Sequence, residues 1–326
     1  MRRFKPVRRV VAVAATSLLL LGVASVASPI RGAAAHERDA AQTKVFTLSP
    51  STHGNPEGVA YDARSGAFFV GATGDGTIYR GTLDSPTATV FIPGAPGRSA
   101  LGMKVADGRL YVAGGATGAL SVYDIVSRQL VASFQTGTGG FLNDLVVTEQ
   151  GDVFVTDSFR PTLWHVTAAQ VRMGGGTPEA IPVGPEIQYQ PGVFNLNGIV
   201  ALKGGRQLVV VQTVNGALFR IDLGSGATTS RAIHQIAVEP LVGGDGLLLD
   251  RGRLIVIQGT PPTLSFVKLN AGASRGMVVE RRTDSTLRGP STIARARDFY
   301  LVVNADFATS ATPFTVSGLP REQDDE

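Results

Sequence analysis

The 326-residue sequence predicts an all-β fold in the form of a six-bladed β-propeller. Apolar residues make up 43% of the chain and there are 40 glycines, yet the 3.6-residue period of an amphipathic helix is almost absent. Short strand-like runs separated by turn residues recur in groups at a period of about 46 residues. Four of the groups are preceded by an oxygen-bearing residue, at separations of 86, 54 and 48 residues, which fit two, one and one steps of that period.

The first 35 residues are typical of an export signal. A basic start is followed by an apolar run over 10–27 and by the small residues Ala33, Ala34 and Ala35. The segment carries six of the 30 basic residues and no acid, so its removal turns the balance from 30 against 26 into 24 against 26. The basic character of the chain therefore belongs to the signal, and nucleic acid and membranes are not expected as partners. A membrane anchor is the competing interpretation of residues 10–27.

The first three blades can be delimited from the amino end. Blade one is predicted over 58–61, 67–71, 77–80 and 87–92, with Asp75-Gly76 as the hairpin turn between its second and third strands. Blade two is predicted over 102–105, 109–113, 119–123 and 130–134. Blade three begins with 145–147, 152–156 and 162–166.

The remaining blades follow the same pattern and suggest how the ring closes. Blade four is predicted over 199–202, 207–212 and 217–221, and blade five over 246–249, 253–257, 263–269 and 276–281. Blade six has 292–294, 299–303 and 314–316 and lacks a fourth strand. Residues 45–48 belong to no complete blade, so the N- and C-terminal strands are expected to pair and close the ring. The expected organisation is a signal at 1–35, a flexible mature N-terminus at 36–43, the propeller at 44–320 and an acidic disordered tail at 321–326.

The four recurring polar residues predict a metal site. In a propeller the first strand of every blade lines the central channel and begins at the same mouth, so residues that precede it converge. The set contains two carboxylates and two amides and no thiol or imidazole, which suits a hard divalent cation, with calcium the natural choice. Each residue alone is also an ordinary turn former, but turn chemistry does not require equal positions in successive blades. The residues are Glu57, Asn143, Asn197 and Asp245.

Other motifs give weaker signals. The string Gly272–Gly276 matches G-x-S-x-G, but it joins two predicted strands of one blade, and a hairpin loop is the simpler interpretation. Four dispersed His and no Cys disfavour a copper, zinc-hydrolase or redox centre and exclude disulfides. Arg160, in a loop of blade three, is a candidate for binding an acidic substrate. The alternative interpretation is an ordinary surface arginine without a role in binding.

These motifs carry a resemblance to a known family. The sequence resembles the SMP-30/gluconolactonase family, also called luciferin-regenerating-enzyme-like, in the order and spacing of four short motifs. The similarity covers essentially the whole of the chain after the signal. The motifs are Pro56-Glu57-Gly58, Leu142-Asn143-Asp144, Leu196-Asn197-Gly198 and Gly244-Asp245-Gly246.

The resemblance implies a six-bladed propeller around one divalent ion, usually calcium and sometimes zinc or magnesium. Residues that match Glu57, Asn197 and Asp245 hold the ion, and the residue that matches Asn143 contacts substrate or ion. Family members hydrolyse lactones, with the residue that matches Asp245 as the proposed base. Sugar lactonases carry an Arg two residues before the blade-three Asn, where this chain has Phe141, which favours a less polar substrate.

Two functional classes follow. The first is a secreted, monomeric, calcium-dependent hydrolase of a lactone or related ester, in which the ion polarises the carbonyl of a small-molecule substrate at the central channel. The second is a non-catalytic secreted propeller that binds a small molecule, glycan or protein and uses the ion for structure only. The fold serves both classes, so only the site can distinguish them.

Overall fold

A computed structural model describes residues 42–224 and 232–321 of the chain. The predicted export signal at 1–35, most of the predicted N-terminal segment at 36–43 and nearly all of the predicted tail at 321–326 lie outside the described residues. No helix among the described residues is long and apolar enough to cross a membrane.

The described part of the chain is built almost entirely from antiparallel four-stranded meanders. Four of them are separate sheets, each in sequence order from the centre outward. Their strands are β6 (Met103–Ala106), β7 (Arg109–Ala113), β8 (Ala119–Asp124), β9 (Leu130–Gln135); β10 (Leu142–Val147), β11 (Val153–Asp157), β12 (Thr162–Val166), β13 (Glu179–Pro182); β14 (Leu196–Leu202), β15 (Gln207–Gln212), β16 (Ala217–Asp222), β17 (Ile233–Gln235); and β18 (Gly244–Asp250), β19 (Arg253–Gln258), β20 (Thr263–Leu269), β21 (Gly276–Arg282).

The fifth sheet has eight strands and contains the first and the last strand of the described residues. Its order is β2-β3-β4-β5-β1-β24-β23-β22, so β1 lies between the four-stranded meander β2–β5 and the three-stranded meander β22–β24. The first strand, β1, pairs antiparallel with β24 and parallel with β5. The predicted pairing of N- and C-terminal strands is therefore confirmed, and it joins the first meander to the last. The strands are β1 (Lys44–Ser49), β2 (Pro56–Asp62), β3 (Ala67–Ala72), β4 (Ile78–Thr82), β5 (Thr87–Ile92), β22 (Pro290–Ala296), β23 (Phe299–Asn304) and β24 (Thr315–Pro320).

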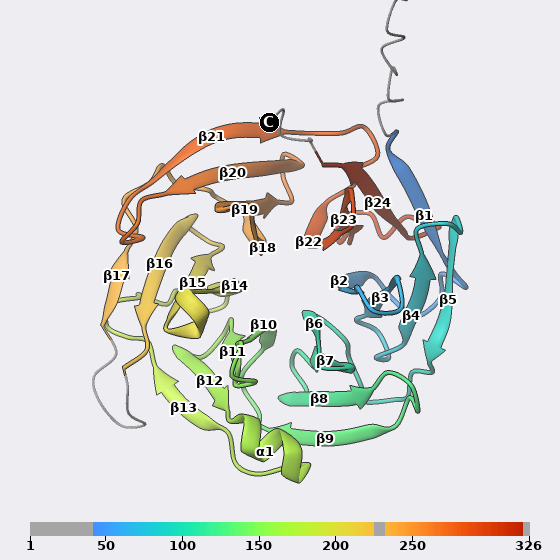
Figure 1. Ribbon diagram of the computed structural model, residues 1–326, viewed down its shortest axis with the longest axis horizontal. Coiled ribbons are helices and arrows are strands. Elements are labelled where there is room, and N and C mark those ends of the chain that lie inside the picture. Colours follow the sequence, from blue (N-terminus) through green and yellow to red (C-terminus); the bar gives the residue numbers. More distant parts are fainter. Residues whose placement is uncertain (1–41, 225–231, 322–326) are drawn as a thin grey trace, which may run out of the picture. The chain divides into compact units, whose positions relative to one another are not determined.

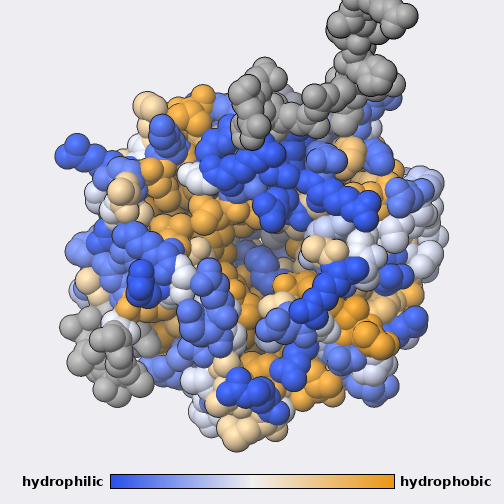
Figure 2. Space-filling model, viewed as in Figure 1, coloured by the Kyte–Doolittle hydropathy of each residue, from blue (hydrophilic) through white to orange (hydrophobic). Residues whose placement is uncertain are grey.

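The innermost strands form a closed ring around a central channel (Figure 1). Each of β2, β6, β10, β14, β18 and β22 contacts the next, and β22 contacts β2. Clusters of buried apolar side chains lie between neighbouring sheets, so the meanders hold one another in place. On the face seen in Figure 2 the centre is hollowed, and apolar residues gather around the hollow.

The sequence analysis placed the strands well and missed the least regular elements. The outer strands β13 and β17 were not predicted, because they are only four and three residues long. The six-residue helix α1 (Ala168–Met173) was also missed. Its start is fixed by a capping box between Thr167 and Gln170 and its end by Gly174 in the left-handed conformation. A short 3-10 turn, η1 (Lys203–Gly205), precedes β15. The G-x-S-x-G string is the hairpin loop between β20 and β21, as expected.

Candidate metal centre

One position near the start of each inner strand faces the channel. Five of the six inner strands change register against their neighbour at this point, and such β-bulges re-aim a side chain. The sequence analysis expected the polar residues just before the strands, but they lie inside them, because these strands begin two or three residues earlier than predicted. The register shifts fall between Pro56 and Val59, Leu142 and Leu145, Leu196 and Ile199, Gly244 and Leu247, and Pro290 and Ile293.

Close packing of successive inner strands identifies the equivalent positions. The residue after the channel-facing one lies against the backbone of the next strand so tightly that four strands carry glycine there. A Cβ on Gly58 would overlap the carbonyl of Leu101, and one on Gly198 would overlap the carbonyl of Asp245. This geometry defines a set that we call the ring positions. They are Glu57, Leu101, Asn143, Asn197, Asp245 and Ser291.

Two of the ring positions carry no free oxygen. In the second meander the position is occupied by Leu101, which the sequence analysis did not name. In the last meander Ser291 occupies the position, and its hydroxyl donates a hydrogen bond to the carbonyl of Glu57 at 2.7 Å. The side chain of Ser291 is therefore used to join β22 to β2.

The other four ring positions each present a buried oxygen without a hydrogen-bond partner. Among the described residues, seven buried side-chain atoms lack a partner, and four of them are on these residues. Buried polar atoms are almost always hydrogen-bonded, because an unpaired one forfeits its hydration without compensation. Four unpaired oxygens at equivalent positions of the inner strands indicate that a bound ligand supplies their missing partner. The atoms are Glu57 Oε2, Asn143 Oδ1, Asn197 Oδ1 and Asp245 Oδ1.

Neighbouring side chains contact both asparagines of the ring. Asn143 Nδ2 donates to Ser158 Oγ at 3.0 Å, and that hydroxyl donates to the carbonyl of Leu196 at 2.6 Å. The side chain of Asn197 lies beside the carboxylate of Asp245 and lowers its pKa. Because the nitrogen of Asn143 has a partner, its amide oxygen is left as a free acceptor.

A third carboxylate lies behind the ring. Asp144 takes the position that is glycine in four other inner strands, and it is 1% exposed. Its Oδ1 accepts from the ammonium of Lys104 at 2.9 Å and from the backbone N–H of Leu145 at 2.8 Å. The sequence analysis did not assign Asp144 or Lys104 a role. The signal was present, because Asp144 interrupts the glycine pattern of the other motifs.

The electrostatics of the centre favour a cation. Burial, followed by the charges of Asp245 and Asp144, raises the pKa of Glu57 well above its ordinary value, and Lys104 only partly offsets this. Burial and the charge of Asp144 raise the pKa of Asp245 to about 8, against a lowering by the side chain of Asn197. Three carboxylates against one ammonium leave two negative charges when all are ionised, which one divalent cation neutralises.

The residues present fit a hard cation bound by oxygen. No three His, Cys, Asp or Glu side chains gather as metal ligands within 42–224 and 232–321, so the amide oxygens of Asn143 and Asn197 are needed to complete a site. Two carboxylate and two amide oxygens match the ligand preference of calcium, which takes six to eight oxygen ligands at about 2.3–2.6 Å. Zinc prefers nitrogen and sulfur donors and fits the set less well.

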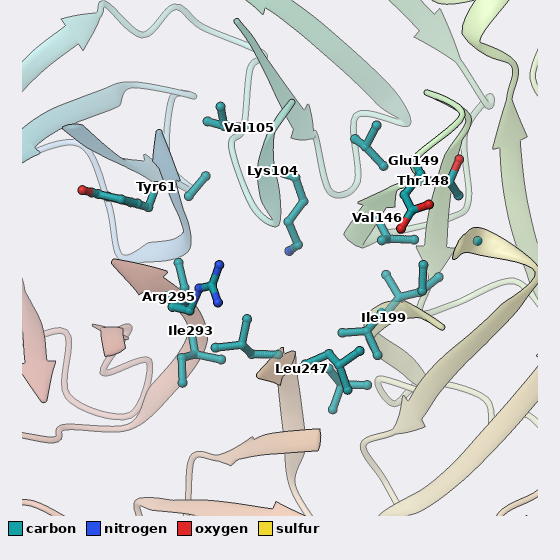
Figure 3. Close-up of a pocket in the computed structure, with 18 of the residues that line it drawn as sticks. Tyr61, Lys104, Val105, Val146, Thr148, Glu149, Ile199, Leu247, Ile293 and Arg295 are labelled. Atoms are coloured by element: carbon teal, nitrogen blue, oxygen red, sulfur yellow. The ribbon is translucent and has the colours of Figure 1, made fainter. Parts of the chain in front are cut away.

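A cavity of about 420 Å³ occupies the channel beyond the ring (Figure 3). Its walls begin two residues further along the inner strands, at Val59, Ile199 and Leu247, and are mainly aliphatic. Lys104 extends into it and pairs with Asp144 at 2.9 Å, and none of the ring residues lines it. The cavity is therefore distinct from the four unpaired oxygens.

The structure places the two remaining candidate residues beside the ring. Phe141 precedes β10 and packs against Phe159 and Phe194. Arg160 donates from Nε to Asp157 Oδ2 at 2.7 Å and from its two terminal nitrogens to Thr136. These contacts hold the loop after β11, and substrate binding by Arg160 stays a prediction.

Comparison with known proteins supports the fold but gives no sequence relative. No protein-family profile matches the sequence, and no curated protein matches it. Solved structures do match. A gluconolactonase from Xanthomonas campestris aligns at a TM-score of 0.59 over 85% of this chain and 89% of its own, with 15% identity. A calcium-binding regucalcin from Agrobacterium tumefaciens aligns at 0.59 over 82% and 92%, with 15% identity.

The fold is a β-propeller. A periplasmic gluconolactonase from Pseudomonas aeruginosa also matches, at a TM-score of 0.54 and 16% identity over 82% of this chain and 87% of its own. The likeness to gluconolactonase and regucalcin propellers is thus confirmed at the level of fold. A WD40 propeller domain matches at 0.54 with 12% identity. Because likeness at such identities shows the fold alone, function has to be argued from the ring residues.

Proposed function

We propose that this protein is a secreted, calcium-dependent hydrolase of a lactone or related ester. We count the eight-stranded sheet as two blades, which makes a six-bladed propeller with one divalent ion at its centre. The observation that carries the proposal is the set of four unpaired, buried oxygens on the ring positions. The gluconolactonase and regucalcin propellers with the same fold add support.

Glu57, Asn197 and Asp245 would hold the ion, and Asn143 would contact the ion or the substrate. A calcium ion held there would supply the positive charge that polarises an ester carbonyl. The protein provides oxygens that are already in place, because the bulged inner strands and the hydrogen bond from Asn143 to Ser158 fix them before binding.

Asp245 is the candidate base. Its carboxylate lies beside the side chain of Asn197, and its Oδ1 is unpaired. From that position it can orient a water molecule and take up its proton. Calcium nearby lowers the proton affinity of this carboxylate, which limits its strength as a base and leaves polarisation of the carbonyl as the larger contribution.

The test is hydrolysis of a lactone panel by the purified chain, with calcium and with a chelator. Calcium-dependent turnover that is lost in Asp245→Ala and Asn197→Ala supports the proposal. The matched control is Asp107→Asn, since the Asp107 side chain is 90% exposed and lies outside the ring. Absence of turnover throughout, in folded and calcium-loaded protein, removes the enzymatic function.

The second candidate function is a non-catalytic secreted propeller with a structural calcium. The same four unpaired oxygens support it, because an ion could satisfy all of them without a substrate. It predicts that calcium raises the melting temperature while no ester is hydrolysed. In both cases we propose a monomer with a small-molecule ligand.

A further inference from the structure

Three phenylalanines form an exposed aromatic cluster beside the ring. The ring centroids of Phe141 and Phe159 lie 5.3 Å apart, those of Phe141 and Phe194 5.1 Å, and those of Phe159 and Phe194 5.2 Å. We call these residues the Phe triad. Phe159 and Phe194 are each 44% exposed, although both are large apolar side chains. Contiguous exposed apolar surface on a folded protein is a mark of an interaction or ligand-binding site.

The Phe triad is fixed to the proposed metal ligands by backbone contacts. Ser158, whose hydroxyl accepts from Asn143, donates its N–H to the carbonyl of Phe141 at 2.8 Å. The carbonyl of Ser158 in turn accepts from the N–H of Asn195, next to Phe194, at 3.1 Å. Ser158 therefore connects all three aromatic segments to the side chain of the ring residue Asn143, so the triad and the metal site keep a set geometry.

Leu101 continues the apolar surface into the ring itself. It occupies the ring position of the second meander, where the first meander carries Glu57. A Cβ on Gly115 would lie 2.8 Å from Leu101 Cδ1 and 3.5 Å from the ring of Phe141, so the two side chains border the same small space. The apolar surface thus runs from Leu101 through Phe141 to Phe159 and Phe194.

This arc offers few hydrogen-bonding groups to a ligand. The cation nearest in sequence, Arg160, uses Nε and both terminal nitrogens on Asp157 and Thr136. The carboxylate of Asp157 accepts from the backbone N–H groups of Phe141, Phe159 and Arg160. A polyhydroxylated sugar ring placed here would lose water without gaining partners, whereas an alkyl or aryl group would gain apolar contact.

We propose that the ligand of the metal site carries an alkyl or aryl group beside its ester carbonyl, and that Leu101 and the Phe triad bind that group. The reaction rests on the function proposed above, but the apolar subsite can be tested by binding alone. The ester carbonyl would lie beside the ion held by the ring oxygens, and the apolar group over the second to fourth meanders.

The turnover test compares two lactones with the same ring size. The calcium-loaded chain is assayed with δ-decalactone, which carries an alkyl chain, and with D-glucono-δ-lactone, which carries hydroxyls. We expect Phe159→Ser and Phe194→Ser each to lower kcat/KM for δ-decalactone about tenfold, with KM rising, and to leave the sugar lactone unchanged. Both side chains are half exposed, so both variants are expected to fold, which the melting temperature with and without calcium verifies.

The matched control is Phe307→Ser. Phe307 is 57% exposed and lies outside the Phe triad, in the segment between β23 and β24. The substitution removes a phenyl ring from a different part of the surface. An equal loss of activity in this variant would overturn the assignment of the subsite to the triad.

A binding measurement separates the subsite from the reaction. Decanoate and gluconate are titrated calorimetrically into the calcium-loaded chain and into the triad variants. If no lactone is hydrolysed but decanoate binds and weakens about tenfold in both triad variants, the enzymatic function fails and the subsite stands. If lactones are hydrolysed without preference and without any effect of the triad variants, the function stands and the subsite is overturned.

Discussion

The affinity of the ring for calcium should rise steeply between pH 7 and pH 9, because the ion binds ionised carboxylates. Burial and the charge of Asp144 raise the pKa of Asp245 to about 8 in the metal-free protein. Asp245 is therefore ionised in about one tenth of the molecules at pH 7 and about nine tenths at pH 9. The dissociation constant should fall about tenfold over this range from Asp245 alone. The raised pKa of Glu57 acts in the same direction.

Isothermal calorimetry measures this linkage directly. Titration of calcium at pH 7 in two buffers of different ionisation enthalpy gives the number of protons released, and we expect about one from Asp245, with a further contribution from Glu57. Asp245→Asn should reduce the release by about one proton and weaken binding. A dissociation constant that is the same at pH 6 and pH 9, with no proton released, would refute the buried-ring site. A surface site with ordinary carboxylates gives that result.

The same pKa directions determine how stability depends on pH in the metal-free protein. A carboxyl group with a raised pKa keeps its proton in the folded state at pH values where the unfolded chain has lost it. The contribution of Asp245 is therefore fully present below the ordinary aspartate pKa of 3.8 and is lost as the pH rises to about 8. Saturating calcium should remove this loss, because the ion favours the ionised form.

Three further predictions concern single substitutions. Asp245→Asn should raise the melting temperature of the metal-free protein at pH 8, since it removes a buried carboxylate that is repelled by its neighbours. It should also abolish the increase of the melting temperature with calcium. A lower melting temperature of the metal-free variant would contradict this. Lys104→Met leaves the buried Asp144 carboxylate unpaired and should destabilise the metal-free protein by about 3 kcal/mol while tightening calcium binding, as measured by denaturant unfolding and calorimetry. Gly58→Ala should destabilise by about 3 kcal/mol, because its Cβ overlaps the next inner strand, whereas Gly184→Ala, with open space around it, should stay within about 0.5 kcal/mol.

The sequence predicted those parts of the ring that repeat. Glu57, Asn143, Asn197 and Asp245 recur at one period, and periodicity is visible without knowledge of the fold. Leu101 could not be recognised in the same way, because an apolar residue at a ring position is indistinguishable from the core residues around it. The sequence analysis therefore did not name the ring residue of the second meander. The backbone approach of Gly58 to Leu101 identifies it, and that approach exists only in three dimensions.

The sequence pattern could not predict residues whose role depends on contacts between segments that are distant in the chain. Phe159 and Phe194 are 35 positions apart and meet because the loop after β11 and the segment before β14 converge on Ser158. Phe141 could be singled out only by comparison with the Arg of sugar lactonases. The pairing of Lys104 with Asp144 likewise depends on the contact between β6 and β10. Such contacts are set by how strands pack and not by local sequence.

The arrangement of the ring indicates that the site is selected for binding at the expense of the metal-free fold. Bulges and glycines bring the inner strands so close that the ring oxygens keep their positions without an ion. Four unpaired oxygens and two repelled carboxylates then remain buried, and each destabilises the folded chain. A core chosen for stability alone would carry apolar side chains at these positions, as it does at Leu101. Because the penalty is already present in the folded protein, little of the binding energy is needed to assemble the site, and calcium should therefore stabilise the chain strongly.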